Sequence, residues 1–276
     1  MSFQIDPPAY WFPQHYVPSA WLEHAPFASW LVSALRPRSI VELGTHNGFS
    51  FFVFAEAVRR LGLECAVDAV DSWQGDDHAG FYGEDVYAGV ASIATAHYPD
   101  FTRLHRAYFS DAVSAFADGS IDLLHIDGRH GYEDVKTDFE TYLPKLSSRA
   151  VVLFHDTHEF HEGFEVHRFW DELALTKPSF NFHHGHGLGV LAYGKEVPGS
   201  ISEFLTQASE HGSIVRNTYH RLGSEVSRVF SDRLELERLA GMDLLLDAAR
   251  EELALHRKSV SWRVTAPLRW VRALLP

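Results

Sequence analysis

Two stretches decide the fold: Ile121-Asp-Leu-Leu-His-Ile-Asp-Gly-Arg-His130 and Ala150-Val-Val-Leu-Phe-His-Asp-Thr157. Each is a short apolar run that ends in polar residues, which is typical of a buried parallel strand that leads into a ligand-binding loop. Asp127 and Asp156 follow these runs, and because we expect the two strands to be neighbours, we expect their carboxylates to converge. Two adjacent carboxylates repel each other unless a cation or a proton lies between them. The pair therefore predicts a site for a hard divalent cation such as Mg²⁺.

The same pattern of apolar runs extends along the chain on both sides of these stretches. Strands are predicted at 39–43, 65–70, 102–105, 121–126, 150–154, 180–183 and 189–193. Helical patterns separate most of these strands, and this alternation is typical of an open, mostly parallel sheet covered on both faces. The last two runs are close enough in sequence to pair antiparallel. We therefore predict an α/β fold with seven strands, helices on both faces and an antiparallel last strand.

Residues outside this alternating region divide the chain into three parts. Residues 1–37 are predicted to form an aromatic, proline-rich arm followed by a helix, and residues 38–198 the main domain. Residues 199–276 are predicted to form a helical extension with a basic amphipathic tail. The helical pattern over 213–257 has apolar residues at three-to-four spacing, which favours either packing on the domain or a dimerisation helix.

Composition excludes several classes of protein. The chain has 276 residues, with 37 acids against 24 Lys and Arg, and a formal net charge of −13. This acidic balance argues against a general nucleic-acid binder. The single cysteine, Cys65, excludes a disulfide scaffold. The chain begins without a basic, then apolar, secretory pattern and contains no apolar run of transmembrane length, so we expect a cytoplasmic protein.

A glycine-containing turn, Gly44-Thr-His-Asn-Gly48, follows the first predicted strand. Glycine permits a tight turn and the close approach of a ligand to the backbone, and the helix after it offers free amide groups. Asp71 ends the next strand, where an acid is placed to accept hydrogen bonds from a ribose diol. Glu42 lies within the first strand, where a buried acid needs a partner that a cationic or amino-group ligand would supply.

Histidines accompany both aspartates. His130 stands three residues after Asp127, close to the predicted ion, where a neutral imidazole serves as a general base. The competing interpretation makes His130 or His155 a ligand of Zn²⁺ or Fe²⁺. A separate group, His183, His184 and His186, is predicted either to line an acceptor pocket or to remain exposed.

Longer segments resemble a known family. The segment IDLLHIDGRHGYEDVKTDFETYLPKLSSRAVVLFHDT resembles the core of class I S-adenosylmethionine-dependent methyltransferases. It is most similar to the metal-dependent branch that includes macrocin-type sugar O-methyltransferases and cephalosporin-hydroxylase-like proteins. VELGTHNGFS resembles the first cofactor motif of that family, and VDSWQGDDHAGFYGEDVY the segment after its second strand. The resemblance covers residues 38–195 and implies a Rossmann-like sheet.

The resemblance implies a role for each matching residue. The implied cofactor-binding residues are Glu42, Gly44, Thr45, Asn47, Asp71, Ser72, Trp73 and Asp127. Among these, Glu42 and Gly44 would lie at the methionine end of the cofactor, Asp71 at the ribose, and Ser72 and Trp73 beside the adenosine. Asp127 and Asp156 would bind Mg²⁺, with His130 as the catalytic base. Related sugar methyltransferases have an acid where this chain has His155, so we assign His155 as the third ligand and keep Mn²⁺ or Fe²⁺ as alternatives.

The resemblance also implies a substrate class. It predicts methyl transfer to a sugar hydroxyl of a cell-surface glycan or a glycosylated metabolite. The segment Ser259-Val-Ser-Trp-Arg-Val-Thr-Ala-Pro-Leu-Arg269 resembles the ends of bacterial cell-surface glycan proteins, which favours polysaccharide biosynthesis. The tail, residues 257–276, carries five Lys and Arg and no acid. It is predicted to contact the inner face of a membrane or a glycosyltransferase partner, and we expect a homo-oligomer, most simply a dimer.

Two other functions compete with this interpretation. A nucleotide-dependent oxidoreductase would use a similar sheet, but the glycines at 44 and 48 do not form the GxGxxG pattern. A non-catalytic assembly module of a glycan-synthesis complex would use the helical tail, but it would not need acids and histidines gathered at strand ends.

Overall fold

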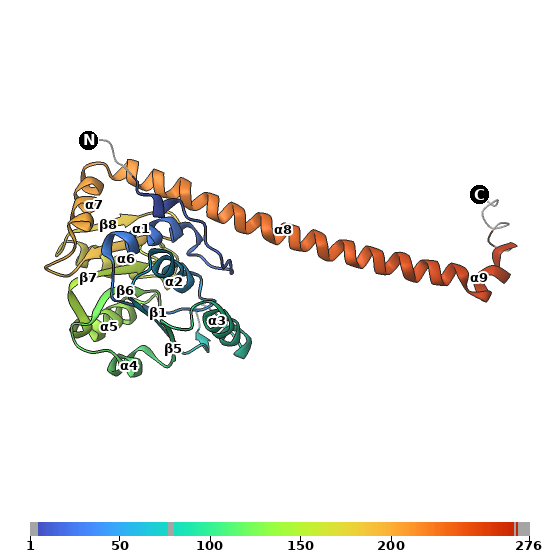
Figure 1. The fold of residues 1–276 in the computed structure, drawn as a ribbon, viewed down its shortest axis with the longest axis horizontal. Coiled ribbons are helices and arrows are strands. Elements are labelled where there is room, and N and C mark those ends of the chain that lie inside the picture. The colour runs from blue at the N-terminus through green and yellow to red at the C-terminus, as the bar shows by residue number, and fades with distance from the viewer. Residues whose placement is uncertain (1–4, 77–79, 268, 270–276) are drawn as a thin grey trace. The chain divides into compact units, whose positions relative to one another are not determined.

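The computed structural model describes residues 5–76, 80–267 and 269. Its centre is a seven-stranded sheet with the order β5-β2-β1-β6-β7-β9-β8 (Figure 1). The strands are β1 (Ser39–Leu43), β2 (Ala66–Asp71), β5 (Thr102–Arg106), β6 (Ile121–Ile126), β7 (Leu146–His155), β8 (Ser179–Phe182) and β9 (Leu188–Ala192). β9 runs antiparallel to both neighbours, whereas the other pairs are parallel. The predicted α/β sheet with an antiparallel last strand is therefore confirmed.

Helices cover both faces of this sheet. The helices of the described residues are α1 (Ala25–Leu35), α2 (Phe49–Leu61), α3 (Glu84–His97), α4 (Phe109–Ala112), α5 (Tyr132–Tyr142), α6 (Val166–Ala174), α7 (Gly199–Glu210), α8 (Gly212–Lys258) and α9 (Val260–Val264). The last of these, α9, and residues 228–258 of α8 belong to a second unit. Short 3₁₀ turns lie at Pro7–Tyr10, Leu22–His24, Val113–Ala115 and Leu143–Lys145, and a small hairpin joins β3 (Gly75–Asp76) to β4 (Gly80–Phe81). α1 packs against α2, and α5 packs against α6.

The strands have apolar side chains on both faces because both faces are covered. All six residues of β6 are buried, as a central parallel strand requires. Its Leu124 and Ile126 belong to the core beneath α5 and α6, which also contains Phe139 and Trp170. His125 faces the opposite side, where its ring packs against Phe54 of α2.

The chain reverses its direction of travel across the sheet at β1. From β1 it proceeds to β2 and β5 on one side, and then to β6 and β7 on the other. A crevice forms at the carboxyl ends of the strands at such a reversal, and ligands bind there. Gly44 (φ +87°) packs against the backbone at the end of β6, because a Cβ atom on it would lie 2.0 Å from the carbonyl oxygen of Asp127. Glycine is therefore required at this point of the crevice.

The chain divides into two compact units, Met1–Ser227, which contains the sheet, and Arg228–Pro276. The first unit includes α7 and the first turns of α8, because these segments bury apolar side chains. These buried residues are Ile201, Phe204, Leu205, Ala208, Val215, Tyr219 and Val226. The arm and helix predicted at 1–37 also belong to the first unit.

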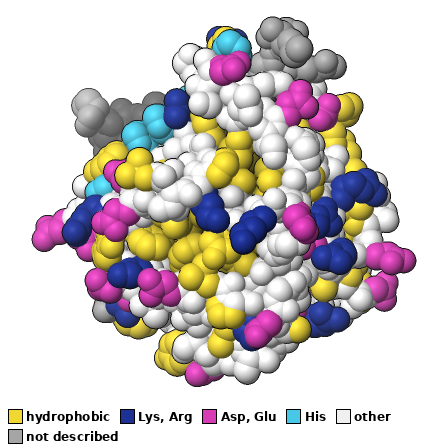
Figure 2. Space-filling model, turned by 90° about the vertical axis from the view of Figure 1, so that its left-hand side faces the viewer, with side chains coloured by type: hydrophobic (Ala, Val, Ile, Leu, Met, Phe, Trp, Pro, Cys, Tyr) yellow, Lys and Arg dark blue, Asp and Glu magenta, His cyan; other side chains and the backbone are white. Residues whose placement is uncertain are grey.

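The second unit is helical over its described residues, as predicted. Its exposed large apolar side chains include Leu234, Leu236, Leu239, Leu244, Leu245 and Val264. No helix among the described residues is both long and apolar enough to span a bilayer. Leu268 and residues 270–276 of the predicted tail lie outside the described residues. On the face of the molecule drawn in Figure 2, acidic and basic side chains are interspersed around a patch of apolar ones.

Candidate active site

A cavity of about 870 Å³ opens at the carboxyl ends of the parallel strands. The loops after β1, β2, β5, β6 and β7 all contribute to its walls. Nine of the eleven predicted site residues line this cavity, namely Gly44, Thr45, Asn47, Asp71, Ser72, Asp127, His130, His155 and Asp156. They gather at the carboxyl ends of the strands, the edge of the sheet at which ligands bind in such folds.

Glu42 and Trp73 do not line the cavity. Glu42 is fully buried and lies opposite His125 in the β1–β6 pair, and the His125 Nδ1 atom is 2.9 Å from Glu42 Oε2. Burial raises the pKa of Glu42. The partner that we expected from a ligand is therefore supplied by the protein itself. Trp73 is 1% exposed, and its indole donates a hydrogen bond to the carbonyl of His46.

Asp71 organises the turn between β1 and α2. Its Oδ2 atom accepts hydrogen bonds from the backbone amides of Thr45 and His46, at 2.8 and 2.9 Å. Its Oδ1 atom accepts a third from the amide of Trp73 at 2.7 Å. Because a carboxylate oxygen has more than one lone pair, Asp71 retains acceptor capacity on the side that lines the cavity.

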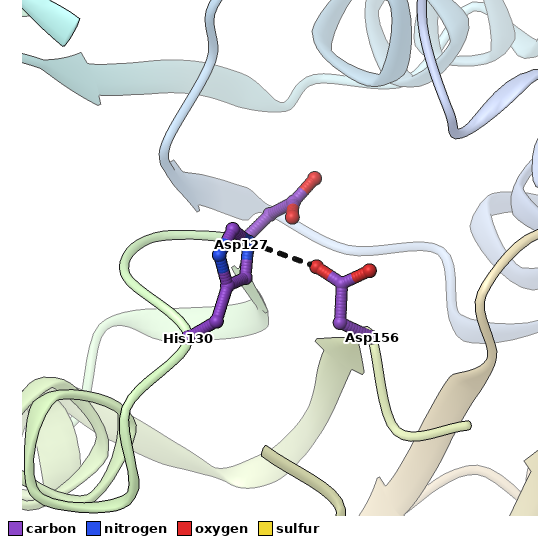
Figure 3. A group of neighbouring side chains, drawn as sticks. All are labelled: Asp127, His130 and Asp156. Carbon is purple, nitrogen blue, oxygen red and sulfur yellow. Dashed lines mark ion pairs between the residues drawn. The ribbon is translucent and has the colours of Figure 1, made fainter. Parts of the chain in front are cut away.

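Asp127, His130 and Asp156 converge in the cavity (Figure 3). One potential ligand atom of each lies within 4.8 Å of the others, and the His130 Nε2 atom is 3.0 Å from Asp156 Oδ2. Asp127 follows β6, Asp156 follows β7, and His130 lies in the loop before α5. Asp156 has a left-handed backbone (φ 59°), which is strained for a residue other than glycine and directs its carboxylate toward the other two side chains.

His155 lies behind the two carboxylates. Its Nδ1 atom is 3.1 Å from Asp127 Oδ1 and 3.3 Å from Asp156 Oδ2, and its Nε2 atom is 3.0 Å from the carbonyl oxygen of Gly185. A carbonyl and a carboxylate only accept hydrogen bonds, so both ring nitrogens must carry a proton. His155 is therefore an imidazolium in this arrangement. A cation at Asp127 and Asp156 would instead meet a neutral imidazole at Nδ1.

The charges of this group shift its pKa values together. Burial disfavours the charged form of His155, but the negative charges of Asp127 and Asp156 outweigh burial and raise its pKa well above the ordinary value. Burial would likewise raise the pKa values of both aspartates, but the charge of His155 and its hydrogen bonds hold both below their usual range. Burial lowers the pKa of His130, but its hydrogen bond to Asp156 and the negative charges of Asp156 and Asp127 together outweigh burial and raise the pKa above its ordinary value. The two acids thus remain ionised side by side.

The donor set suits a divalent cation. Two carboxylate oxygens and one imidazole nitrogen are ligands that Mn²⁺ and Fe²⁺ accept readily, and Mg²⁺ accepts the oxygens and completes its shell with water. The predicted convergence of Asp127 and Asp156 is thus present in the structure. The third member of this group is His130, which the sequence offered as an alternative ligand to His155.

Several cavity residues carry no signal in the sequence that we interpreted. The ring of Phe164 stacks on His130 with centroids 4.3 Å apart. Phe109, Gly128 and Asp138 line the cavity between α4 and α5. Glu159 accepts hydrogen bonds at the cavity wall from His161 and His186. Of the predicted histidine group, His183 and His184 do not line the cavity.

A family model described as a methyltransferase domain matches residues 41–157, which include β1, the turn after it and both aspartates. An uncharacterised protein of Sinorhizobium fredii, y4gI, is 56% identical over 179 residues, or 65% of this chain and 20% of that protein. The chain therefore spans about a fifth of the length of this curated relative.

Solved structures with similarity to this chain include methyltransferases. A putative caffeoyl-CoA O-methyltransferase from Staphylococcus aureus has a TM-score of 0.48 and 18% identity, over 64% of this chain and 84% of that one. The O-methyltransferase TomG from Streptomyces achromogenes, solved in complex with SAM, has a TM-score of 0.46 and 18% identity, over 65% and 82% of the two chains.

Proposed function

We propose that this chain, which carries a class I, S-adenosylmethionine-dependent methyltransferase domain, transfers the methyl group to a hydroxyl oxygen of a sugar with the help of a divalent cation. The observation that carries the proposal is the convergence of Asp127, His130 and Asp156 inside the cavity that Asp71 and the turn after β1 also line. A methyl donor bound along that turn would present its sulfonium group beside these three side chains.

The residues of the site have separate tasks in this reaction. Asp71 and the turn after β1 hold the methyl donor, whose sulfonium supplies an electrophilic methyl group. His130 accepts the proton of the acceptor hydroxyl, and the adjacent Asp156 carboxylate, which the Nε2 atom of His130 faces, stabilises the resulting imidazolium. The stacked ring of Phe164 fixes the plane of the imidazole. Holding the oxygen and the methyl carbon in line accounts for most of the remaining acceleration.

Asp127 and Asp156 would hold the divalent cation, with His155 or His130 as the nitrogen ligand. When bound there, a divalent cation lowers the pKa of a nearby hydroxyl, which is otherwise far above neutrality. We favour Mg²⁺ because its two fixed ligands are carboxylates, and Mn²⁺ or Fe²⁺ would take the imidazole more readily.

Aromatic side chains at the cavity support a sugar acceptor. Phe81 and Tyr108 line the cavity and are 78% and 63% exposed. Tyr82, which also lines it, stacks on His46 with ring centroids 4.8 Å apart. Exposed aromatic faces pack well against the C–H faces of sugar rings. A surface glycan or its precursor therefore fits this side of the cavity, and we place the protein in polysaccharide biosynthesis.

Methyl transfer is tested directly with labelled S-adenosylmethionine and a panel of nucleotide sugars and oligosaccharides. We expect transfer that is abolished by a chelator, restored by Mg²⁺ or Mn²⁺, and lowered roughly 10²–10⁴-fold in His130→Ala, the range for a lost general base. NAD⁺ replaces the donor in a parallel arm that tests the oxidoreductase. Transfer that persists in the chelator and in Asp127→Ala would refute the role of the cation.

The partners of the protein are part of the same proposal. We assign the exposed apolar residues of α8 to self-association as a dimer, and the basic tail to an anionic membrane surface or a glycosyltransferase. Removing residues 228–276 is expected to abolish self-association and vesicle binding while methyl transfer continues. A truncated protein that remains dimeric by light scattering would contradict the role of α8.

A further inference from the structure

We infer that Asp138 recognises the amino edge of the adenine ring of the methyl donor, an inference that rests on the proposed function. Asp138 lies on α5, and its side chain lines the cavity together with those of Thr137 and Thr141. No step of the reaction proposed above uses it. It is also separate in the chain from Asp127 and Asp156, which follow β6 and β7.

Asp138 lies where the cavity extends between α4 and α5. A Cβ atom on Gly128 would lie 2.5 Å from Cε2 of Phe109 and 3.1 Å from Asp138 Oδ2. The Phe109 ring and the Asp138 carboxyl group therefore pack closely against the backbone of Gly128, and all three residues line the cavity. The Tyr142 hydroxyl donates a hydrogen bond to the carbonyl of Phe109 at 3.0 Å, which holds α5 against α4 at this part of the cavity.

The Asp138 carboxyl group has no partner within residues 5–76, 80–267 and 269. Burial, followed by the negative charge of Asp134, raises its pKa to about 7. A partly buried polar group without a partner costs folding free energy, so a ligand that pairs with it is favoured. A protonated carboxyl group offers one acceptor and one donor side by side.

Adenine has the complementary pattern at this edge. Its 6-amino group donates a hydrogen bond and the adjacent ring nitrogen accepts one. The sheet order decides which way the base extends. Asp127 and Asp156 lie on one side of β1, whereas Asp71 and then β5 lie on the other. If the sulfonium of the methyl donor lies near the aspartates and its ribose at Asp71, its adenine ring extends toward α4, which follows β5.

The test compares two ligands, S-adenosylhomocysteine and its analogue in which the purine lacks the 6-amino group, by isothermal titration calorimetry. We expect wild-type protein to prefer the adenosyl ligand by about tenfold, the effect of one or two hydrogen bonds. Asp138→Leu is expected to lose this preference by binding the adenosyl ligand more weakly, with little change for the analogue. Asp138→Asn is expected to keep the preference, because an amide also offers one donor and one acceptor.

Glu140→Gln is the matched control, because Glu140 is an exposed acid on the same helix that does not line the cavity. It is expected to behave as wild type. If Asp138→Leu weakens both ligands equally, or neither, the contact with the amino group is refuted while the donor site stands. If wild-type protein binds neither ligand, the proposed function fails and this inference with it. Asp138→Ala serves the same comparison if the leucine variant does not fold.

Discussion

Gly44→Ala is expected to disrupt the crevice at which the fold and the site meet. The added Cβ atom would lie 2.0 Å from the carbonyl oxygen and 2.6 Å from the carbonyl carbon of Asp127, and neither backbone atom can rotate away. The loop after β1 would have to separate from the end of β6, where the amide of Asp127 donates a 2.8 Å hydrogen bond to the carbonyl of Leu43.

The expected cost follows from three contributions. An alanine at φ +87° costs about 1–2 kcal/mol, an overpacked contact about 1–3 kcal/mol, and a lost hydrogen bond about 1 kcal/mol. We therefore expect the free energy of unfolding to fall by about 4 kcal/mol. Gly62→Ala is the matched control, because Gly62 also has a positive φ of 59° but a Cβ atom added to it would have no neighbour within 4 Å. It is expected to cost about 1–2 kcal/mol, from the backbone alone.

Urea unfolding followed by tryptophan fluorescence measures both variants, since Trp21, Trp30, Trp73 and Trp170 are buried in the first unit. We also expect Gly44→Ala, but not Gly62→Ala, to lose binding of S-adenosylhomocysteine. The reasoning would be refuted if the two variants had equal stabilities, or if Gly44→Ala bound the ligand as wild type does.

Three further results are expected. Asp156→Asn should lower the rate of methyl transfer by at least about 100-fold while the affinity for S-adenosylhomocysteine changes little. If the rate and the affinity fall by the same factor, a role of Asp156 at the cation is contradicted. Asp138→Asn should become more stable than wild type as pH rises from about 4 to 7, because the pKa of Asp138, raised to about 7, makes the folded wild-type protein retain a proton that its unfolded chain has lost. The difference in free energy of unfolding should reach about 2 kcal/mol, after allowance for partial exposure, and stay constant above pH 7 in thermal unfolding experiments. A difference that does not change with pH would refute the raised pKa. Asp122→Ala should cost about 2–3 kcal/mol, because the buried Asp122 carboxylate accepts hydrogen bonds from the Ser147 hydroxyl and the Arg38 amide, whereas the exposed Asp118→Ala should cost under about 1 kcal/mol.

The strand ends were visible in the sequence because they combine two local signals. A buried parallel strand reads as an unbroken apolar run, and a ligand-binding loop reads as acids, histidines and glycines directly after it. Asp127 and Asp156 carry both signals, so the sequence alone predicted their strands and the edge of the sheet at which they lie. Gly44 and Asp71 were placed at the same edge by the same reasoning.

Contacts between distant segments were decided only by the tertiary structure. Glu42 meets His125 because β1 and β6 pair in a register that no local pattern reveals, and the pair removes Glu42 from the cavity. The pKa of His155 is raised because packing brings it between Asp127 and Asp156, and the carbonyl of Gly185, 30 residues away, faces its other nitrogen. Asp138 reads in the sequence as an ordinary helical acid, and only the packing of α5 against α4 brings it to the cavity wall. The sequence determines which side chains stand at the strand ends, but the packing of strands and helices determines which of their atoms meet, and proton positions and ligand contacts depend on those distances.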